Sequence, residues 1–274
     1  MLAWVLAVGC QDLTPGEWVL GDEIAAIVMT GQAGYGRSVA VQDERILVGD
    51  ALHMGSWTDG LTRIGGAKAR RVGFVGTEPW VWLSSQTVAW GEELQETMGV
   101  GVATSVDRCP DGTFVLTDGV GESVACSTQG VLRTRCTDER CVVQIDGGPI
   151  LDEVSPGGAV AWQDGRACWG DPQLANEEAT GRVACDDGLE QFGLIGDHLG
   201  LSIGGGRAAG RFNRHIIPPR LRIVPLGEGP VWLVDRAAEN SRVSLSSDEH
   251  HTAVGVPAFR QGPTSGRIYL VERP

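Results

Sequence analysis

The sequence has almost no lysine and no long hydrophobic run, and both absences restrict what the protein can bind. Lys68 is the only lysine, and the formal net charge is -13. Such a chain would repel a phosphate backbone, so nucleic acid is not expected as a partner. No stretch approaches the ~20 apolar residues that a membrane-spanning helix needs, so the body of the protein is expected to be soluble.

The sequence also lacks the common catalytic motifs. It has no G-x-S-x-G elbow, no P-loop and no H-E-x-x-H helix. The adjacent His250 and His251 would point to opposite faces of a strand, and the pair Asp197 and His198 falls inside a repeated turn. We therefore expect no catalytic residue, no cofactor and no metal site. The alternative is a hydrolase or lyase whose site lies in a central channel.

Glycine is abundant, and this favours an all-β fold. The chain has 40 glycines and 13 prolines among 274 residues, yet 42% of its residues are hydrophobic. Glycine at about twice its usual share of roughly 7% implies many turns in a folded chain. Runs of four to six residues rich in Val, Ile, Leu and Trp lie between these turns, and such short runs are typical of antiparallel strands.

Three segments repeat without gaps. They read GRSVAVQDERILVGD from Gly36, GGAVAWQDGRACWGD from Gly157 and RVSLSSDEHHTAVGVP from Arg242. Each start is followed 13 residues later by a glycine, and 11 residues after that by another that we expect to open a third strand. The first landmarks are Gly49, Gly170 and Gly255, and the second are Gly60, Gly181 and Gly266.

Weaker copies begin near Glu78 and near residue 200. The starts near 36, 78, 157, 200 and 242 are then 42, 79, 43 and 42 residues apart, which leaves room for one more unit in the long interval. We expect its strands at FVLTDG and GESVACS, with CVVQIDG nearby. About six units result, and a seventh could fit between residues 104 and 150.

A repeat of 40 to 45 residues with four strands is typical of a β-propeller blade. We therefore predict one propeller domain over residues 22–274, with six or seven four-stranded blades. The last copy stops after its third strand at Val271, and an extra apolar run, Ile24 to Met29, precedes the first copy. We expect this N-terminal strand to become the outer strand of the last blade and to close the ring.

Tryptophans fit the same picture. We expect five of them to fill the space between neighbouring blades: Trp82, Trp90, Trp162, Trp169 and Trp232. An aromatic sugar-binding platform is the alternative role for tryptophan in this chain. Its candidates, in turn-like surroundings, are Trp57 and Trp80.

The N-terminus indicates export. Residues 1–9 read MLAWVLAVG, an apolar run that ends in a small residue directly before Cys10. This resembles a bacterial lipoprotein signal, in which the cysteine is lipidated and becomes the new N-terminus. We expect residues 10–21 to be a short tether and the protein to sit at the outer membrane or cell surface, touching the membrane only through its lipid. The alternative is a buried strand with an ordinary cysteine.

Six further cysteines lie in the middle of the chain. An even number in an exported protein suggests disulfides, since an oxidising compartment permits them. Zinc is disfavoured because no C-x-x-C pair is present. We expect neighbours to pair, each pair joining one local hairpin: Cys109 with Cys126, Cys136 with Cys141, and Cys168 with Cys185.

The repeats resemble FG-GAP repeats, the blades of the integrin alpha-subunit propeller and of many bacterial surface proteins. The resemblance rests on YGRSVAV with ILVGD, on LGLSI after GD, and on TAVGVP followed by SGRIYLV. It implies an extracellular propeller that binds a partner through loops on one face. We expect a monomer whose partner is a protein or glycan. A second resemblance, of DGRACWGD to propellers of the regulator-of-chromosome-condensation type, fits the repeat length less well.

Family members often hold calcium in a turn between the first two strands. Here the equivalent turns read QDER, QDGR and SDEH, which offer too few oxygens for the six to eight that calcium takes. The nearest remnant of such a site is Asp107 with Asp111 and Asp118. We therefore expect no bound calcium.

Overall fold

We analysed a computed structural model. It describes residues 17–20, 26–32, 35–137, 139–171, 181–194, 202–204, 206–212, 220–234, 243–259 and 265–273. Within these ranges every regular element is a strand, and the strands form six sheets. No helix in these ranges has the length and apolar character that crossing a membrane requires. The all-β prediction is confirmed.

The sheets follow one another along the chain. The first contains β3 (Val39–Gln42), β4 (Arg45–Val48), β5 (Asp50–Ser56), β6 (Gly60–Val75), β7 (Glu78–Leu83), β8 (Thr87–Trp90) and β9 (Glu96–Gly99). The second is the pair β10 (Ser105–Arg108) and β11 (Phe114–Thr117). The third contains β12 (Val124–Ser127), β13 (Gly130–Cys136), β14 (Cys141–Ile145) and β15 (Ile150–Val154).

Three more sheets complete the chain. The fourth contains β16 (Val160–Gln163), β17 (Arg166–Asp171), β18 (Gly181–Cys185) and β19 (Glu190–Leu194). The fifth contains β20 (Ser202–Gly204), β21 (Arg207–Phe212), β22 (Arg220–Pro225) and β23 (Val231–Val234), with β1 (Glu17–Val19) added beside β23. The sixth contains β24 (Ser244–Ser247), β25 (His251–Phe259) and β26 (Ser265–Glu272), with β2 (Ala26–Gln32) beside β26.

The seven-stranded sheet is two units that share one long strand. The first part of β6 pairs with β5, from Gly60 to Ala69, and its second part pairs with β7, from Ala69 to Val75. The pairing of β6 with β7 shifts register between Ala69 and Arg71, close to the point where the partner of β6 changes from β5 to β7. β6 is therefore the fourth strand of one unit and the first strand of the next.

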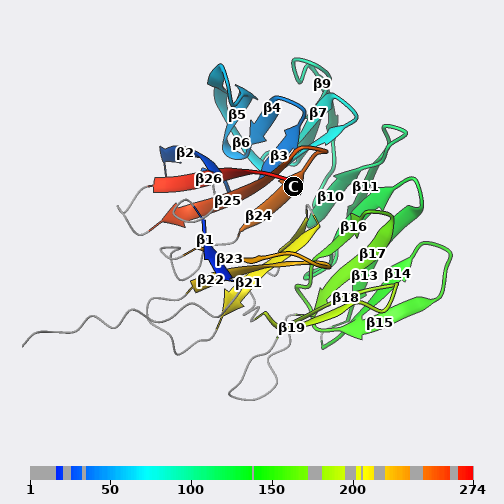
Figure 1. Ribbon diagram of the computed structural model, residues 1–274. Coiled ribbons are helices and arrows are strands. Elements are labelled where there is room, and N and C mark those ends of the chain that lie inside the picture. The colour runs from blue at the N-terminus through cyan, green and yellow to red at the C-terminus, as the bar shows by residue number, and fades with distance from the viewer. Residues whose placement is uncertain are drawn as a thin grey trace, which may run out of the picture.

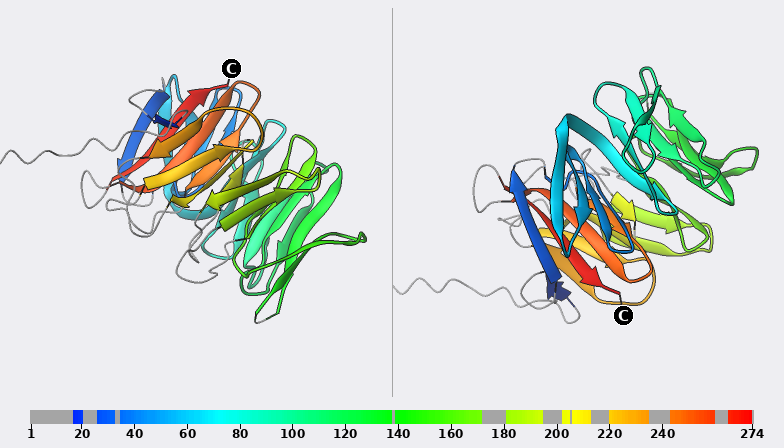
Figure 2. Two further views of the ribbon diagram at one scale, coloured as in Figure 1. Left: turned by 60° about the horizontal axis from the view of Figure 1, so that its bottom comes forward. Right: turned by 90° about the horizontal axis from the view of Figure 1, so that it is seen from above.

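The first strands of successive units lie side by side around a common centre. Contacts run from β3 to β6, then to β10, β12, β16, β20 and β24, and β24 contacts β3 again. In Figure 1, β3, β10, β16 and β24 lie near the middle of the molecule, while β2, β5, β9 and β15 lie at its outside. Figure 2 shows the blue N-terminal strands beside the red C-terminal ones in both views. This arrangement of small sheets is that of a β-propeller.

Apolar clusters fill the spaces between neighbouring sheets. Trp169 packs with Leu132 and Val143 between the third and fourth sheets, and Trp232 packs with Val254 between the fifth and sixth. Each small sheet is thus buried by its neighbours, because one sheet of four short strands cannot bury both faces alone. The prediction that tryptophans lie between blades is confirmed for Trp169 and Trp232.

Side chains of one unit also satisfy backbone N–H groups of the next inner strand. The Ser38 hydroxyl accepts the Val72 N–H at 3.0 Å. In the same way Asp107 accepts the Cys126 N–H at 2.9 Å, and Ser246 accepts the Val41 N–H at 3.3 Å. An innermost strand has one edge without a neighbouring strand, so these bonds supply part of the pairing that the edge lacks.

The N-terminal strands join the end of the chain. β2 pairs antiparallel with β26 over seven residue pairs, from Ala26 opposite Val271 to Gln32 opposite Ser265. It is the outermost strand of the last sheet, which is the pairing that the sequence predicts. β1, within the range expected to be a tether, pairs parallel with β23.

The repeat predicts the first hairpin of each copy correctly. Counting from each start, the fourth residue pairs with the thirteenth in all three: Val39 with Val48, Val160 with Trp169, and Leu245 with Val254. Two of the turns use an aspartate with a positive φ, 53° at Asp43 and 51° at Asp164. Aspartate tolerates this left-handed conformation better than most residues, which explains the acidic residue at that position.

The later part of the repeat is less regular than expected. Gly60 begins the fourth strand of its unit, whereas Gly181 begins a third strand, because the first copy makes a tight turn at Gly49 and gains β5. The copy predicted from Glu78 begins at β7, the second strand of its unit. The segments FVLTDG and GESVACS, expected in one unit, form β11 and β12 in different sheets. Residues 104–154 therefore hold two sheets.

Tyr35 lies where the first and last sheets meet. Its side chain is 7% exposed and packs with Ile46 and Ile268, one from each sheet. The Ser244 hydroxyl donates to the Gly36 carbonyl at 2.8 Å in the same region. Burial raises the pKa of Tyr35 from 10.0 to about 12, because the phenolate would lose its water.

We predict an alkaline loss of stability that depends on Tyr35. The raised pKa means that its contribution is complete below pH 10 and is lost as the pH rises through about 12. Near-ultraviolet absorbance of the wild type minus that of Tyr35→Phe should show phenolate forming with a midpoint near 12. A midpoint at the ordinary value of 10 would contradict the burial of this residue.

Candidate functional site

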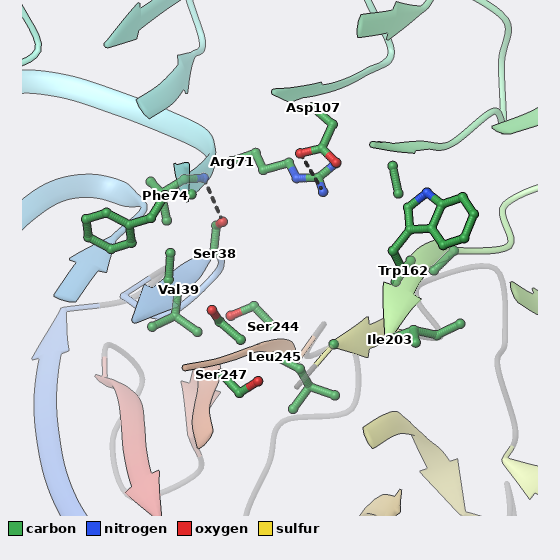
Figure 3. Close-up of a pocket in the computed structure, with 18 of the residues that line it drawn as sticks. Ser38, Val39, Arg71, Phe74, Asp107, Trp162, Ile203, Ser244, Leu245 and Ser247 are labelled. Atoms are coloured by element: carbon green, nitrogen blue, oxygen red, sulfur yellow. Dashed lines mark hydrogen bonds and ion pairs between the residues drawn. The ribbon is translucent and has the colours of Figure 1, made fainter. Parts of the chain in front are cut away.

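A polar cavity of about 630 Å³ lies where the inner strands converge. Figure 3 shows Arg71, Asp107, Trp162 and Ser244 around it, on strands of four different units. Arg37, Arg70 and Arg108 also line the cavity, although the chain as a whole is acidic. A hydrolase or lyase site, the alternative that the sequence leaves open, is expected at such a central position.

Arg71 joins three units at the wall of this cavity. Its Nη2 lies 3.3 Å from Asp107 Oδ1, and its Nη1 donates to the carbonyls of Val106 at 2.9 Å and Val124 at 3.3 Å. Asp107 in turn accepts the N–H of Cys126. Asp107 thus contacts two neighbouring units, and its ion pair with Arg71 has a structural role in joining the inner strands.

The sheet β10–β11 is exceptional among the described sheets because it has two strands. The Cys109 N–H donates to the Thr113 carbonyl at 2.8 Å. Hydrogen bonding alternates along an antiparallel strand, so Thr113 and Val115 face β10 while the backbone groups of Phe114 and Leu116 face away. Within the described residues β11 pairs with no strand other than β10. This side of β11 is an open sheet edge.

Three exposed apolar side chains lie on or next to this hairpin. Leu116 in β11 is 39% exposed, Val102 before β10 is 81% exposed and Val120 after β11 is 89% exposed. Thr104 joins the segments before β10 and after β11, since its N–H donates to Thr117 and its hydroxyl donates to Gly119. We call Val102, Leu116 and Val120 the apolar patch. Clustered exposed apolar side chains are typical of interaction surfaces.

Sequence reasoning missed this surface, although the spacing contained a signal. Only 19 residues separate the starts of β10 and β12, too few for the four-stranded unit that the repeat implied. Because the repeats align poorly in this region, the sequence predicts one four-stranded unit here in place of a two-stranded sheet followed by a four-stranded one. Val102 and Val120 follow or precede glycines and resemble ordinary turn residues in the sequence.

The structure has disulfides between the same cysteines that the sequence pairs. Cys136–Cys141 and Cys168–Cys185 each join residues that lie opposite one another in a hairpin. Cys109–Cys126 is different, because it joins β12 to the end of β10 in another sheet, so the expectation of a local hairpin is wrong for this pair. It fixes the two-stranded sheet to its larger neighbour.

Several candidate side chains from the sequence have structural roles. Trp80 is 2% exposed inside a cluster with Val88 and Val106, so it offers no sugar-binding platform. Trp57 is half-buried against His251, with ring centroids 4.6 Å apart. Backbone N–H groups of His250 and His251 both donate to Asp248.

The suspected calcium remnant is dispersed. Asp107 pairs with Arg71, while Asp111 caps its own turn by accepting the N–H and hydroxyl of Thr113. These hydrogen bonds lower the pKa of Asp111. In the part of the chain that the structure describes, no group of three or more His, Cys, Asp or Glu side chains could hold a metal ion. Cys10, Asp197, His198 and the start of the apolar run at Ile24 lie outside the described residues.

We predict that Arg71→Ala lowers the free energy of unfolding by about 1–3 kcal/mol, because it leaves the largely buried Asp107 carboxylate without its cation. Chemical denaturation measures this change. Arg37→Ala is the matched control, since Arg37 lines the same cavity but is exposed, and its effect should stay within about 0.5 kcal/mol. Equal losses for both variants would contradict the joining role of Arg71.

Comparison with known proteins assigns no family. No family model and no curated protein matches the chain. Among solved structures, Saccharomyces cerevisiae Sqt1 aligns at 11% identity and a TM-score of 0.46, covering 92% of this chain and 99% of its own. BamB from Moraxella catarrhalis aligns at 9% identity and a TM-score of 0.39, covering 85% of this chain and 81% of its own. TolB from Acinetobacter baumannii aligns at 8% identity and a TM-score of 0.40, covering 88% of this chain and 79% of its own. Likeness at these values establishes neither a family nor an activity.

Proposed function

We propose that this protein is an exported, non-catalytic binding propeller whose open β11 edge takes up an extended segment of a partner protein. The observation that carries the proposal is the two-stranded sheet β10–β11, with its open edge next to the apolar patch. An extended peptide can add a strand to such an edge, with main-chain hydrogen bonds supplying affinity. A glycan has no strand backbone to pair there, so we favour protein over glycan.

The charges around the edge favour a basic partner. Asp111 and Asp118 are exposed and flank β11 at its two ends. The chain as a whole carries a net charge of -13, which also disfavours pairing of two copies through this edge. The occupant that fits is a segment with apolar residues alternating with Lys or Arg, since alternate side chains of a strand face opposite ways.

We also propose a closed ring of seven units. The circuit of inner-strand contacts supports closure, with β24 beside β3 and the N-terminal β2 beside β26. The six sheets include β10–β11, and the division of the seven-stranded sheet at β6 raises the count of units from six to seven. The shared hairpin register supports descent of these units from a repeat of the FG-GAP kind.

Export and lipid anchoring complete the proposal. Three disulfides are what an oxidising compartment permits. The apolar run before Cys10 supports a lipid-anchored monomer at the outer membrane or cell surface.

Mass spectrometry of the protein purified from its native membrane tests the export proposal. We expect a mature chain that begins at Cys10 with its thiol lipidated. A chain that retains residues 1–9 and an unmodified Cys10 would contradict lipid anchoring and leave the binding proposal to its own test.

A peptide titration tests the binding site. We expect an extended peptide of alternating Val and Arg to bind the folded protein, and the same peptide with Glu for Arg to bind at least about tenfold more weakly. Leu116→Pro removes the outward N–H of β11 and should abolish binding, because an edge strand tolerates proline but then cannot donate. Isothermal calorimetry measures the affinity.

Leu116→Val is the matched control. It keeps both the outward N–H and an apolar side chain of the patch, and valine suits a strand, so this variant should retain most of the affinity. Melting temperatures of both variants show whether each is folded. Equal binding by Leu116→Pro and wild type, or no preference for the basic peptide, would overturn this site.

A further inference from the structure

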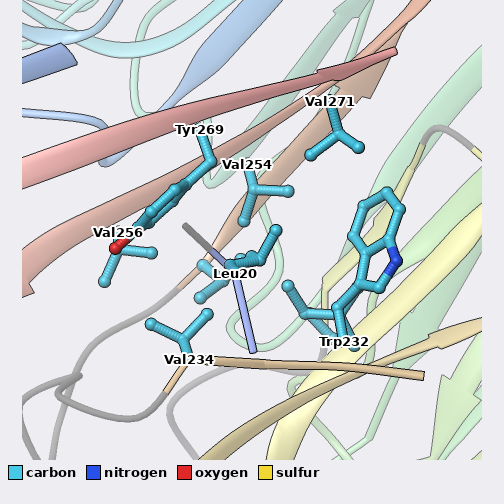
Figure 4. Packing of buried hydrophobic residues seen from close by; sticks show 10 residues of the cluster. Leu20, Trp232, Val234, Val254, Val256, Tyr269 and Val271 are labelled. Carbon is cyan, nitrogen blue, oxygen red and sulfur yellow. The ribbon is translucent and has the colours of Figure 1, made fainter. Parts of the chain in front are cut away.

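A second cavity, of about 310 Å³, lies between the fifth and sixth sheets, and no residue of β10 or β11 lines it. Its lining includes Arg207 at the start of β21, Trp232 in β23 and Thr252 in β25, with Arg273 directly after β26. Figure 4 shows Trp232 beside the apolar cluster of these two sheets, with its indole nitrogen on the side away from Leu20 and Val234. The cavity thus adjoins a well-packed interface.

Two guanidinium groups share this cavity. Arg207 stacks on Trp232, with Cζ 3.4 Å from the ring centroid, and its Nη1 donates to the Pro230 carbonyl at 2.9 Å. Arg273 Nη1 donates to the Asp248 carbonyl at 2.9 Å. Among the described residues, no carboxylate oxygen lies within 4.0 Å of a nitrogen of either guanidinium group, which is the distance limit for an ion pair. Both cations therefore have carbonyl partners and no anionic partner in the described part of the chain.

This arrangement costs free energy in the absence of an anion. Burial, and then the neighbouring charge of Arg273, lower the pKa of Arg207 to about 10. The indole N–H of Trp232, a side chain that is 5% exposed, also lacks an acceptor in the described part of the chain. Among the described residues the two guanidinium groups thus lack an anionic partner, which a bound carboxylate would supply.

The lining of the same cavity also carries the opposite charge. Asp164, Glu228 and Glu272 line it from three different units, and all three are exposed. These carboxylates would repel a ligand with only negative charge, and the guanidiniums would repel a ligand with only positive charge. Charge complementarity therefore favours a molecule that carries both charges at opposite ends.

We propose that this cavity binds a small zwitterion of the amino-acid class. The carboxylate lies against Arg207 and Arg273, and the ammonium group faces Asp164, Glu228 and Glu272. A guanidinium suits this role because its fixed fork of N–H donors matches a carboxylate. The volume of about 310 Å³ accommodates a molecule of this size and excludes a long peptide. This site goes beyond the protein-binding function and does not depend on it.

Isothermal calorimetry with defined probes tests the proposal. The zwitterions are L-alanine and glycine betaine, and the matched halves of betaine are acetate and tetramethylammonium. We expect both zwitterions to bind, and each half to bind at least about tenfold more weakly. Arg273→Gln should reduce the affinity for both zwitterions by at least about tenfold, while Arg140→Gln, in an exposed ion pair on another sheet, should leave it unchanged.

Variation of pH gives a second readout. Betaine has an ammonium group that cannot titrate, so its affinity should stay level at neutral pH and fall as the pH rises through about 10, where Arg207 loses its charge. Arg273 is exposed, so the Arg273→Gln variant should fold, and its melting temperature should equal that of the wild type. Acetate binding as tightly as the zwitterions, no heat from either zwitterion, or full affinity in Arg273→Gln would each overturn the proposal.

Discussion

The structure depends on one constraint: each small sheet must be covered on both faces by its neighbours. Four short strands cannot form a separate core, so stability comes from the clusters between sheets, such as the one around Trp169. The last sheet must then meet the first, and Tyr35 with Ile268 fills that contact. Side chains such as Ser38 and Ser246 complete the circuit by bonding the free inner edge of the next unit.

The unit that satisfies this constraint least well is the one with functional interest. Among the described residues, apolar clusters fill the spaces between sheets except between β10–β11 and β12–β15, where the Cys109–Cys126 disulfide and the Asp107 to Cys126 hydrogen bond make the connection. A covalent link and polar contacts can hold a sheet too small for a core. They leave unpaired, among the described residues, the outer edge at which we propose that a partner binds.

The sequence allowed prediction of the fold class, of the first hairpin in three copies of the repeat and of the strand added by the N-terminus. These follow from local patterns, because alternating apolar residues, an aspartate that tolerates positive φ and a spare strand are visible in a single chain. The division of β6 was not predictable, since it depends on a register shift near Ala69. The open edge was also missed, because it results from strands that are absent. The cavity that Arg207 and Arg273 share was not predictable either, because these residues are far apart in the sequence and meet only through the packing of two sheets.

The central claim is that the end sheets meet and that the N-terminal strand completes the last one. Thermal unfolding of a chain that begins at residue 31, compared with one that begins at residue 22, tests it most directly. The account predicts that loss of the strand lowers the melting temperature of the whole domain by at least about 10 °C, in a single transition. An unchanged melting temperature would contradict it, because β2 would then contribute nothing to the closure of the ring.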